Sequence, residues 1–255
     1  MILAQSKQPV LINGDGCSLL YDSELLDSPV ATYLSSDIFD QALNCQQITQ
    51  SGRGQAWFIE LLGLSTVLRS YQRGGLVAKF NQQTYIGWSP ESSRAYKEYR
   101  LLNHLCEMGL PVPRPIAASF CRGLLGLVPL YRARILLQRI PNAQTFDHLL
   151  SETVLDDSVW QSVGVCIRHF HDQGIYHADL NANNILLNDQ QLVYLIDFDK
   201  GEIRKEKQQE AQWKLDNLQR LKRSLLKQQA LREEYAFNEE NWSSLLDAYN
   251  GTLDS

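Results

Sequence analysis

The sequence predicts an α+β protein in two lobes, with an antiparallel sheet and one helix in residues 1–140 and a mainly helical part in residues 141–255. Three observations predict this division. Up to residue 140, short apolar runs alternate with glycine turns, and Pro141-Asn142 then breaks the strand pattern. Over residues 157–173, apolar side chains recur at helical spacing. After them, two apolar runs joined by Asn188-Asp189 predict a short hairpin.

Composition narrows the class of protein. A chain of 255 residues with 44% hydrophobic residues can form a substantial core. Its net charge of −5 excludes the broad basic surface of nucleic-acid-binding proteins. The first residues lack the basic segment and apolar core of a signal peptide, and no run approaches the roughly 18 apolar residues of a membrane span. We expect a protein that stays in the compartment where it is made and meets a membrane only from the side.

The cysteines are scattered, odd in number and never spaced as Cys-x-x-Cys. This usage predicts reduced thiols in a cytosolic protein, with neither a zinc site nor a disulfide framework. The five are Cys17, Cys45, Cys106, Cys121 and Cys166.

The first lobe contains a weak signal for phosphate binding. Residues 1–44 form an N-terminal extension without a catalytic pattern, although a hairpin is expected between Val10–Ile12 and Ser18–Tyr21. The next segment has the pattern of two strands joined by a glycine turn. In that turn, Gly52 and Gly54 would let backbone amides approach a phosphate closely. A plain hairpin turn explains the same residues, so the signal alone decides nothing.

Two cations compete for the role of pairing with nucleotide phosphates. Lys79 follows Val-Ala on an expected strand, which is the local pattern of the phosphate-pairing lysine in kinases. If the glycine turn opens the sheet, however, counting strands gives that place to Arg69. A helix over residues 89–108 carries Glu98, which could hold either cation by an ion pair. An ordinary surface cation is the alternative for both.

The remaining elements follow from periodicity. Strands are expected at Leu124–Leu130 and Arg134–Ile140, and helices over residues 145–150, 157–173, 206–234 and 241–249. Near the end of the second helix, His169 and His171 are two residues apart and therefore lie on different faces. We interpret both as surface residues, not as metal ligands.

The helix over residues 206–234 carries the one clear local excess of positive charge. A basic amphipathic helix can bind an anionic membrane surface or a phosphorylated ligand. A helix packed by its leucine stripe with its charges in water explains the pattern equally. Both interpretations stay open.

The central motif runs from Ile175 to Gly201 and concentrates oxygen ligands. Asp179, Asn184 and Asp197 suit a hard cation such as Mg²⁺ with nucleotide phosphates. The spacing His-x-Asp, then Asn five residues after the Asp, then a strand ending in Asp-Phe is that of the catalytic loop and metal strand of protein-kinase-like phosphotransferases. Turn residues that merely cap two strands would have no reason to occur in this order.

Five segments of the chain together resemble one known family. They are His177-Ala-Asp-Leu-Asn-Ala-Asn-Asn-Ile-Leu, Ile196-Asp-Phe-Asp-Lys-Gly, Ser51-Gly-Arg-Gly-Gln-Ala-Trp-Phe, Leu68-Arg-Ser-Tyr-Gln-Arg-Gly-Gly-Leu-Val-Ala-Lys and Ser93-Arg-Ala-Tyr-Lys-Glu-Tyr-Arg-Leu-Leu. The family they resemble is that of the 3-deoxy-D-manno-octulosonic acid (Kdo) kinases, which belong to the protein-kinase-like superfamily alongside the lipopolysaccharide core heptose kinases. The resemblance implies a bilobal kinase-like fold. It also implies ATP-dependent phosphorylation of the 4-hydroxyl of Kdo on a lipid A precursor, at the cytoplasmic face of the inner membrane.

The same resemblance implies roles for the motif residues. Asp179 would be the base that orients the sugar hydroxyl and accepts its proton late in the reaction. Asn184 and Asp197 would hold Mg²⁺ against the phosphates of ATP. Lys79 or Arg69, steadied by Glu98, would place those phosphates, and His177 would support the loop.

Departures from the protein-kinase pattern argue against a protein substrate. Ala178 replaces the arginine that clamps an activation-loop phosphate, and no Ala-Pro-Glu motif follows Gly201. A protein substrate is therefore not expected. Two other hypotheses stay open: a small-molecule phosphotransferase of the aminoglycoside or choline type, and a non-catalytic pseudokinase. The intact Asp179, Asn184 and Asp197 weigh against the last.

Overall fold

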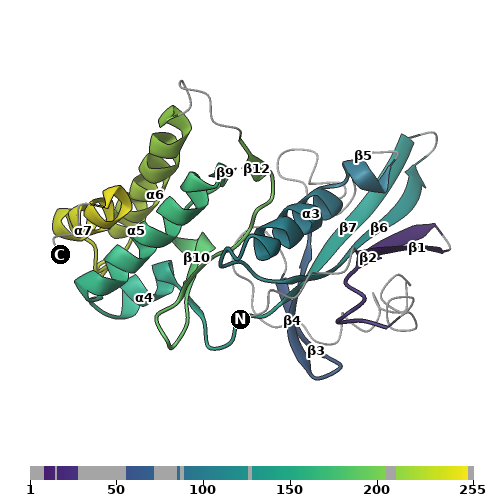
Figure 1. The fold of residues 1–255 in the computed structure, drawn as a ribbon, viewed down its shortest axis with the longest axis horizontal. Coiled ribbons are helices and arrows are strands. Elements are labelled where there is room, and N and C mark those ends of the chain that lie inside the picture. Colours follow the sequence, from purple (N-terminus) through teal and green to yellow (C-terminus); the bar gives the residue numbers. More distant parts are fainter. Residues whose placement is uncertain are drawn as a thin grey trace. The chain divides into compact units, whose positions relative to one another are not determined.

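We analysed a computed structural model of the chain, which describes residues 9–14, 16–27, 56–71, 85–86, 89–125, 128–204 and 211–251. The chain divides into two compact units (Figure 1). The first comprises Met1–Glu107 and Arg114–Arg139, and the second comprises Met108–Pro113 and Ile140–Ser255. The first unit is an antiparallel sheet with one long helix and the second is mainly helical, so the predicted α+β class is confirmed. The short segment Met108–Pro113, which the sequence analysis placed in the first lobe, belongs to the second unit.

One antiparallel sheet dominates the first unit, with strand order β1-β2-β6-β7-β4-β3 and β5 paired to β7. Its strands are β1 Val10–Gly14, β2 Cys17–Tyr21, β3 Ala56–Leu61, β4 Leu64–Ser70, β5 Tyr85–Ile86, β6 Pro115–Leu125 and β7 Val128–Gln138. The hairpin predicted near the N-terminus is confirmed, since β1 pairs with β2 from Val10↔Tyr21 to Gly14↔Cys17.

The strand predicted at Leu124–Leu130 is wrong. The chain instead enters the sheet at Pro115, runs to Leu125, and starts the next strand at Val128. Proline can occupy the first position of a strand, where its missing donor is tolerated. The alanines that follow carry no β-branched signal, which is why the sequence pattern missed this strand.

Helix α3, Arg94–Glu107, lies against β6 and β7 of the sheet (Figure 1). Ser89 caps a separate 3-10 turn, η2 Pro90–Ser92, where its hydroxyl accepts a hydrogen bond from the Glu91 amide at 3.3 Å. The residue before α3 is Ser93, whose hydroxyl accepts a hydrogen bond from the Tyr96 amide at 3.3 Å. Four apolar side chains at helical spacing are buried. They are Tyr96, Tyr99, Leu102 and Leu105. This face fixes the rotation of α3 and therefore the position of Glu98, which is also buried.

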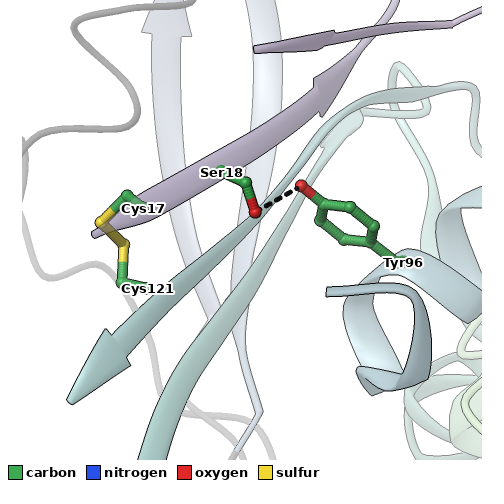
Figure 2. The surroundings of a disulfide bond; sticks show 4 residues. All are labelled: Cys17, Ser18, Tyr96 and Cys121. Carbon is green, nitrogen blue, oxygen red and sulfur yellow. Dashed lines mark hydrogen bonds between the residues drawn. A yellow bond between two sulfur atoms is a disulfide. The ribbon is translucent and has the colours of Figure 1, made fainter. Parts of the chain in front are cut away.

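A disulfide links β2 to β6 (Figure 2). Cys17 and Cys121 are direct partners in the strand register, with Cα atoms 4.0 Å apart and 104 residues apart in sequence. The prediction that all cysteines are reduced is wrong for this pair, because pairing across strands so distant in sequence leaves no trace in cysteine spacing. Next to it, the Tyr96 hydroxyl of α3 lies 3.2 Å from the Ser18 hydroxyl (Figure 2). Among the described residues, Cys106 and Cys166 are free.

The second unit contains four helices and several short strands in the part that the structure describes. The helices are α4 Phe146–Glu152, α5 Asp157–Asp172, α6 Ala211–Leu231 and α7 Glu239–Asn250. The short elements are β8 Gln144–Thr145, β9 Ile175–Tyr176, η3 Ala182–Asn184, β10 Ile185–Leu187, β11 Val193–Leu195 and β12 Glu202–Ile203. Each of the four predicted helices is thus present, with ends shifted by a few residues. None of the helices within the described ranges has the length and apolar character needed to cross a membrane.

Close packing of α5 on α7 organises the helical part. A Cβ atom added at Gly164 would lie 2.2 Å from the main-chain oxygen of Leu245. Only glycine therefore permits this approach. Asn238 begins α7 with a reciprocal capping box to Asn241.

Candidate active site

The predicted hairpin forms the base of the site in the second unit. β10 pairs antiparallel with β11, from Ile185↔Leu195 to Leu187↔Val193. The side chain of Asn188 closes the turn by accepting a hydrogen bond from the amide of Leu192 at 2.9 Å. At the other end of the hairpin, the pairing continues into the functional residues.

Asn184 and Asp197 lie at this same end of the hairpin. The Ile196 amide donates to the Asn184 carbonyl at 3.0 Å, so the residue before Asp197 is bonded directly to the backbone of Asn184. Asp197 has a φ of 65°, which is unusual for a residue other than glycine. Such conformations persist where the surrounding structure imposes them, and they concentrate at functional sites.

The ring of His177 ties the loop to this strand. Its Nε2 lies 2.8 Å from the Ile196 carbonyl, and its Nδ1 accepts a hydrogen bond from the Asp179 amide at 3.2 Å. These partners fit a neutral ring protonated at Nε2. Burial lowers the pKa of His177, which favours the same neutral form. The ring of Phe198 lies against it, with centroids 4.7 Å apart.

The backbone of Asp179 is held from both sides, while its carboxylate is exposed. Its carbonyl accepts hydrogen bonds from the side-chain amides of Asn184 at 2.8 Å and Asn181 at 3.0 Å. Asn181 also caps η3 by accepting from the Asn183 amide at 2.9 Å. The loop therefore presents a carboxylate on a fixed backbone, as a base that positions a hydroxyl requires.

Helix α6 clamps the loop with two polar side chains that sequence reasoning missed. Asn217, 1% exposed, accepts from the His177 amide at 3.3 Å and donates to the His177 carbonyl at 3.0 Å. Ser224 accepts from the Ala182 amide at 3.2 Å. One signal could have revealed Asn217, because it lies four residues after Trp213 and four before Leu221, and hence on the apolar face of the helix.

Behind Asn217 lies His171, and the interpretation of His171 as a surface residue is wrong. His171 is 2% exposed, with Nδ1 2.9 Å from the Tyr249 hydroxyl and Nε2 3.4 Å from Asn217 Oδ1. Burial lowers its pKa to about 4. The two histidines do lie on different faces as predicted, and His169 is exposed. The helical spacing was right, but α6 and α7 cover the face that carries His171.

In the first unit, Glu98 is paired with Arg69. Nη1 of Arg69 lies 2.9 Å from Oε1 of Glu98, and the Tyr71 hydroxyl donates to Oε2 of the same carboxylate. Arg69 is on β4, between β3 and β7 in the sheet. Lys79, Gly52 and Gly54 lie outside the described residues.

The donor set fits magnesium better than a transition metal. Since the Asn184 side-chain nitrogen is bonded to the Asp179 carbonyl, its amide oxygen points away from that bond. An amide oxygen and the Asp197 carboxylate are hard ligands of the kind Mg²⁺ uses together with phosphate oxygens and water.

Comparison with known proteins agrees with this geometry. Residues 42–249 match the model of the lipopolysaccharide kinase (Kdo/WaaP) family. The chain belongs to this family. It is 44% identical over 205 residues to the 3-deoxy-D-manno-octulosonic acid kinase of Mannheimia succiniciproducens, covering 78% of this chain and 82% of that protein. The enzyme of the same name from Vibrio parahaemolyticus is 38% identical over 234 residues, covering 89% of this chain and 92% of that protein.

A solved structure of the ROP18 kinase domain in complex with AMP-PNP and sucrose is a weaker match, with 12% identity and a TM-score of 0.41 over 62% of this chain and 51% of that chain. The family assignment rests on the sequence relatives. It makes the chain a kinase and confirms the resemblance inferred from the sequence motifs.

Proposed function

We propose that this kinase transfers the terminal phosphoryl group of ATP to the 4-hydroxyl of Kdo on a lipid A precursor, as part of lipopolysaccharide inner-core biosynthesis. The observation that carries the proposal is the loop that fixes the Asp179 backbone beside Asn184, in a chain 38–44% identical to enzymes named Kdo kinases. The reaction would take place at the cytoplasmic face of the inner membrane, with the protein bound peripherally to an anionic surface.

In this proposal each site residue has one task. The carboxylate of Asp179 orients the sugar hydroxyl and accepts its proton as transfer proceeds. Asn184 and Asp197 would hold Mg²⁺, which neutralises charge on the phosphates when it is bound. Arg69, held by the buried Glu98, would pair with the phosphates of ATP. Because this chemistry requires positioning and charge stabilisation more than covalent catalysis, few groups are needed.

Of the two competing cations, we propose Arg69 and not Lys79 as the one that pairs with the phosphates. The Glu98 ion pair with Arg69, on a strand inside the sheet, supports this choice. Arg69→Ala should raise the KM for ATP and lower kcat, whereas Lys79→Ala should alter neither. The reverse pattern would restore Lys79 to the role. Gly52 and Gly54 are retained as the proposed backbone contacts to phosphate.

An acceptor panel tests the proposed function. The purified protein is incubated with Mg-ATP and one of four acceptors: a Kdo-bearing lipid A precursor, the same lipid without Kdo, an aminoglycoside, or choline. We expect a gain of one phosphate on the first acceptor alone, and fragmentation in the mass spectrometer should locate it on Kdo. Phosphorylation of the aminoglycoside or choline instead would favour the small-molecule alternative. Turnover of none of them would favour the pseudokinase.

A further inference from the structure

Arg220 of α6 is a partly buried cation whose Nε has no hydrogen-bond acceptor among the described residues. Lys222 lies 2.7 Å from a carboxylate oxygen of Glu239, and Lys214 lies 4.0 Å from one of Asp172. Arg220 makes no hydrogen bond or ion pair with any of the described residues, and its Nε is buried without an acceptor. A buried donor that is left unsatisfied costs stability, so such a donor in a folded protein requires an explanation.

The position of Arg220 places its stem on the catalytic-loop side of α6. It lies three residues after Asn217 and four before Ser224, and these spacings put all three on one helical face. Asn217 bonds the backbone of His177 and Ser224 bonds that of Ala182. Arg220 therefore emerges between the two contacts that hold the loop.

The positive charge of Arg220 acts on His177 in the loop. Burial is the main cause of the lowered pKa of His177, and the positive charge of Arg220 acts in the same direction. Arg220 as a whole is only partly buried. By contrast, Arg223 on the same helix is exposed.

The loop supplies no cation of its own. Residues 177–184 contain neither lysine nor arginine, and the position before Asp179 is Ala178. The sugar hydroxyl whose proton Asp179 accepts must lie at this loop. Any acidic group of the same sugar then needs a positive partner nearby. Guanidinium offers a planar fork that matches a carboxylate with two parallel hydrogen bonds.

We propose that Arg220 binds the carboxylate of the acidic sugar acceptor and thereby selects an acidic over a neutral sugar. The inference rests on the proposed function, because it assumes that the acceptor is a sugar acid. The phosphates of ATP have their own partners in Arg69 and the magnesium ligands. Arg220 is therefore a determinant of acceptor specificity, separate from nucleotide binding.

Steady-state kinetics with two acceptors test this role. The parent, Arg220→Gln, Arg220→Lys and the control Arg223→Gln are compared on the Kdo-bearing lipid A precursor and on its Kdo methyl ester, in which the carboxylate is neutral. On the acid, Arg220→Gln should raise the acceptor KM by about 10- to 100-fold, the range expected for a hydrogen bond to a charged group. The KM for ATP should stay unchanged. The acceptor KM of Arg220→Lys should lie between those of the parent and Arg220→Gln. The acceptor KM of Arg223→Gln should match that of the parent.

The ester distinguishes a carboxylate contact from general damage. Replacing the acid by the ester should raise the acceptor KM of the parent by the same factor as Arg220→Gln raises it on the acid. On the ester, Arg220→Gln should raise the acceptor KM no further. Three results would overturn the inference: Arg220→Gln raises the acceptor KM equally on acid and ester, leaves the acceptor KM unchanged, or changes only the KM for ATP. A parent that does not discriminate between acid and ester would overturn it without any variant. A parent that turns over neither acceptor would refute the proposed function itself, and this inference with it.

Discussion

Replacing Asn217 by alanine tests whether α6 holds the catalytic loop in place. The substitution removes both hydrogen bonds between the side-chain amide and the backbone of His177, at 3.3 Å and 3.0 Å, from a residue that is 1% exposed. It also removes the acceptor that lies 3.4 Å from His171 Nε2. Gln219→Ala is the matched control, since Gln219 is exposed on the same helix.

The magnitude follows from the groups left unsatisfied. Each buried polar group that loses its partner costs about 1–3 kcal/mol. The His177 amide and carbonyl are both left in this state, and the lost volume adds a smaller cost unless water enters the gap. We expect the free energy of unfolding to fall by about 2–5 kcal/mol. Because the His177 peptide precedes Asp179 closely, kcat should fall as well, while the KM for ATP stays near that of the parent.

Urea denaturation and steady-state kinetics measure the two effects. With a urea dependence of about 1–3 kcal/mol per molar, a loss of about 3 kcal/mol lowers the midpoint by about 1–3 M. Gln219→Ala should stay within about 0.5 kcal/mol of the parent, as surface substitutions usually do. An Asn217→Ala protein that unfolds and turns over like this control would refute the idea that α6 fixes the loop.

Three further predictions concern stability. As pH falls from 6.5 to 4, His171 takes up a proton in the unfolded chain but stays largely neutral in the folded protein, where its pKa is about 4. The free energy of unfolding should therefore fall by about 3 kcal/mol over this range. This component should be absent in His171→Gln. Gly164→Ala places a methyl group against the Leu245 carbonyl and should destabilise the protein by at least about 1–3 kcal/mol, measured by urea denaturation. Exchanging both Cys17 and Cys121 for serine should lower the free energy of unfolding of the oxidised protein by about 2–4 kcal/mol, because the bond closes a long loop of the unfolded chain.

Each of these three stability predictions has a control. His169→Gln changes an exposed histidine on the same helix and should keep the full pH dependence of the parent. Val165→Ala alters a half-exposed side chain beside Gly164 and should cost little. Reductant should bring the parent down to the stability of the double-serine variant. A parent that is unaffected by reductant would argue against the disulfide.

The sequence was most informative where function depends on spacing along the chain. Two apolar runs joined by Asn188-Asp189 predicted a hairpin, and the structure has that hairpin, with Asn184 and Asp197 at one end. Local periodicity also predicted α3 and α5, because each buries one apolar stripe. Turn and capping residues act over a few positions, so their effects can be read without knowledge of the tertiary structure.

Three features that sequence reasoning missed depend on partners distant in the chain. Cys17 meets Cys121 only because β2 pairs with β6. Asn217 reaches His177 across 40 residues, and His171 is buried only because α6 and α7 cover it. Composition and spacing carry no record of which helix faces pack together. The choice between Lys79 and Arg69 stayed open for the same reason, since strand counting depends on the sheet order.

The most direct measurement of the central claim is single-turnover phosphoryl transfer by Asp179→Asn. Asparagine keeps the size of the side chain but cannot accept the proton of the sugar hydroxyl. With Mg-ATP and a Kdo-bearing lipid A precursor, we predict that transfer to Kdo slows by about 100- to 10,000-fold, the usual contribution of a general base, while ATP still binds with the affinity of the parent. Transfer at the rate of the parent would contradict the assignment of Asp179 as the catalytic base.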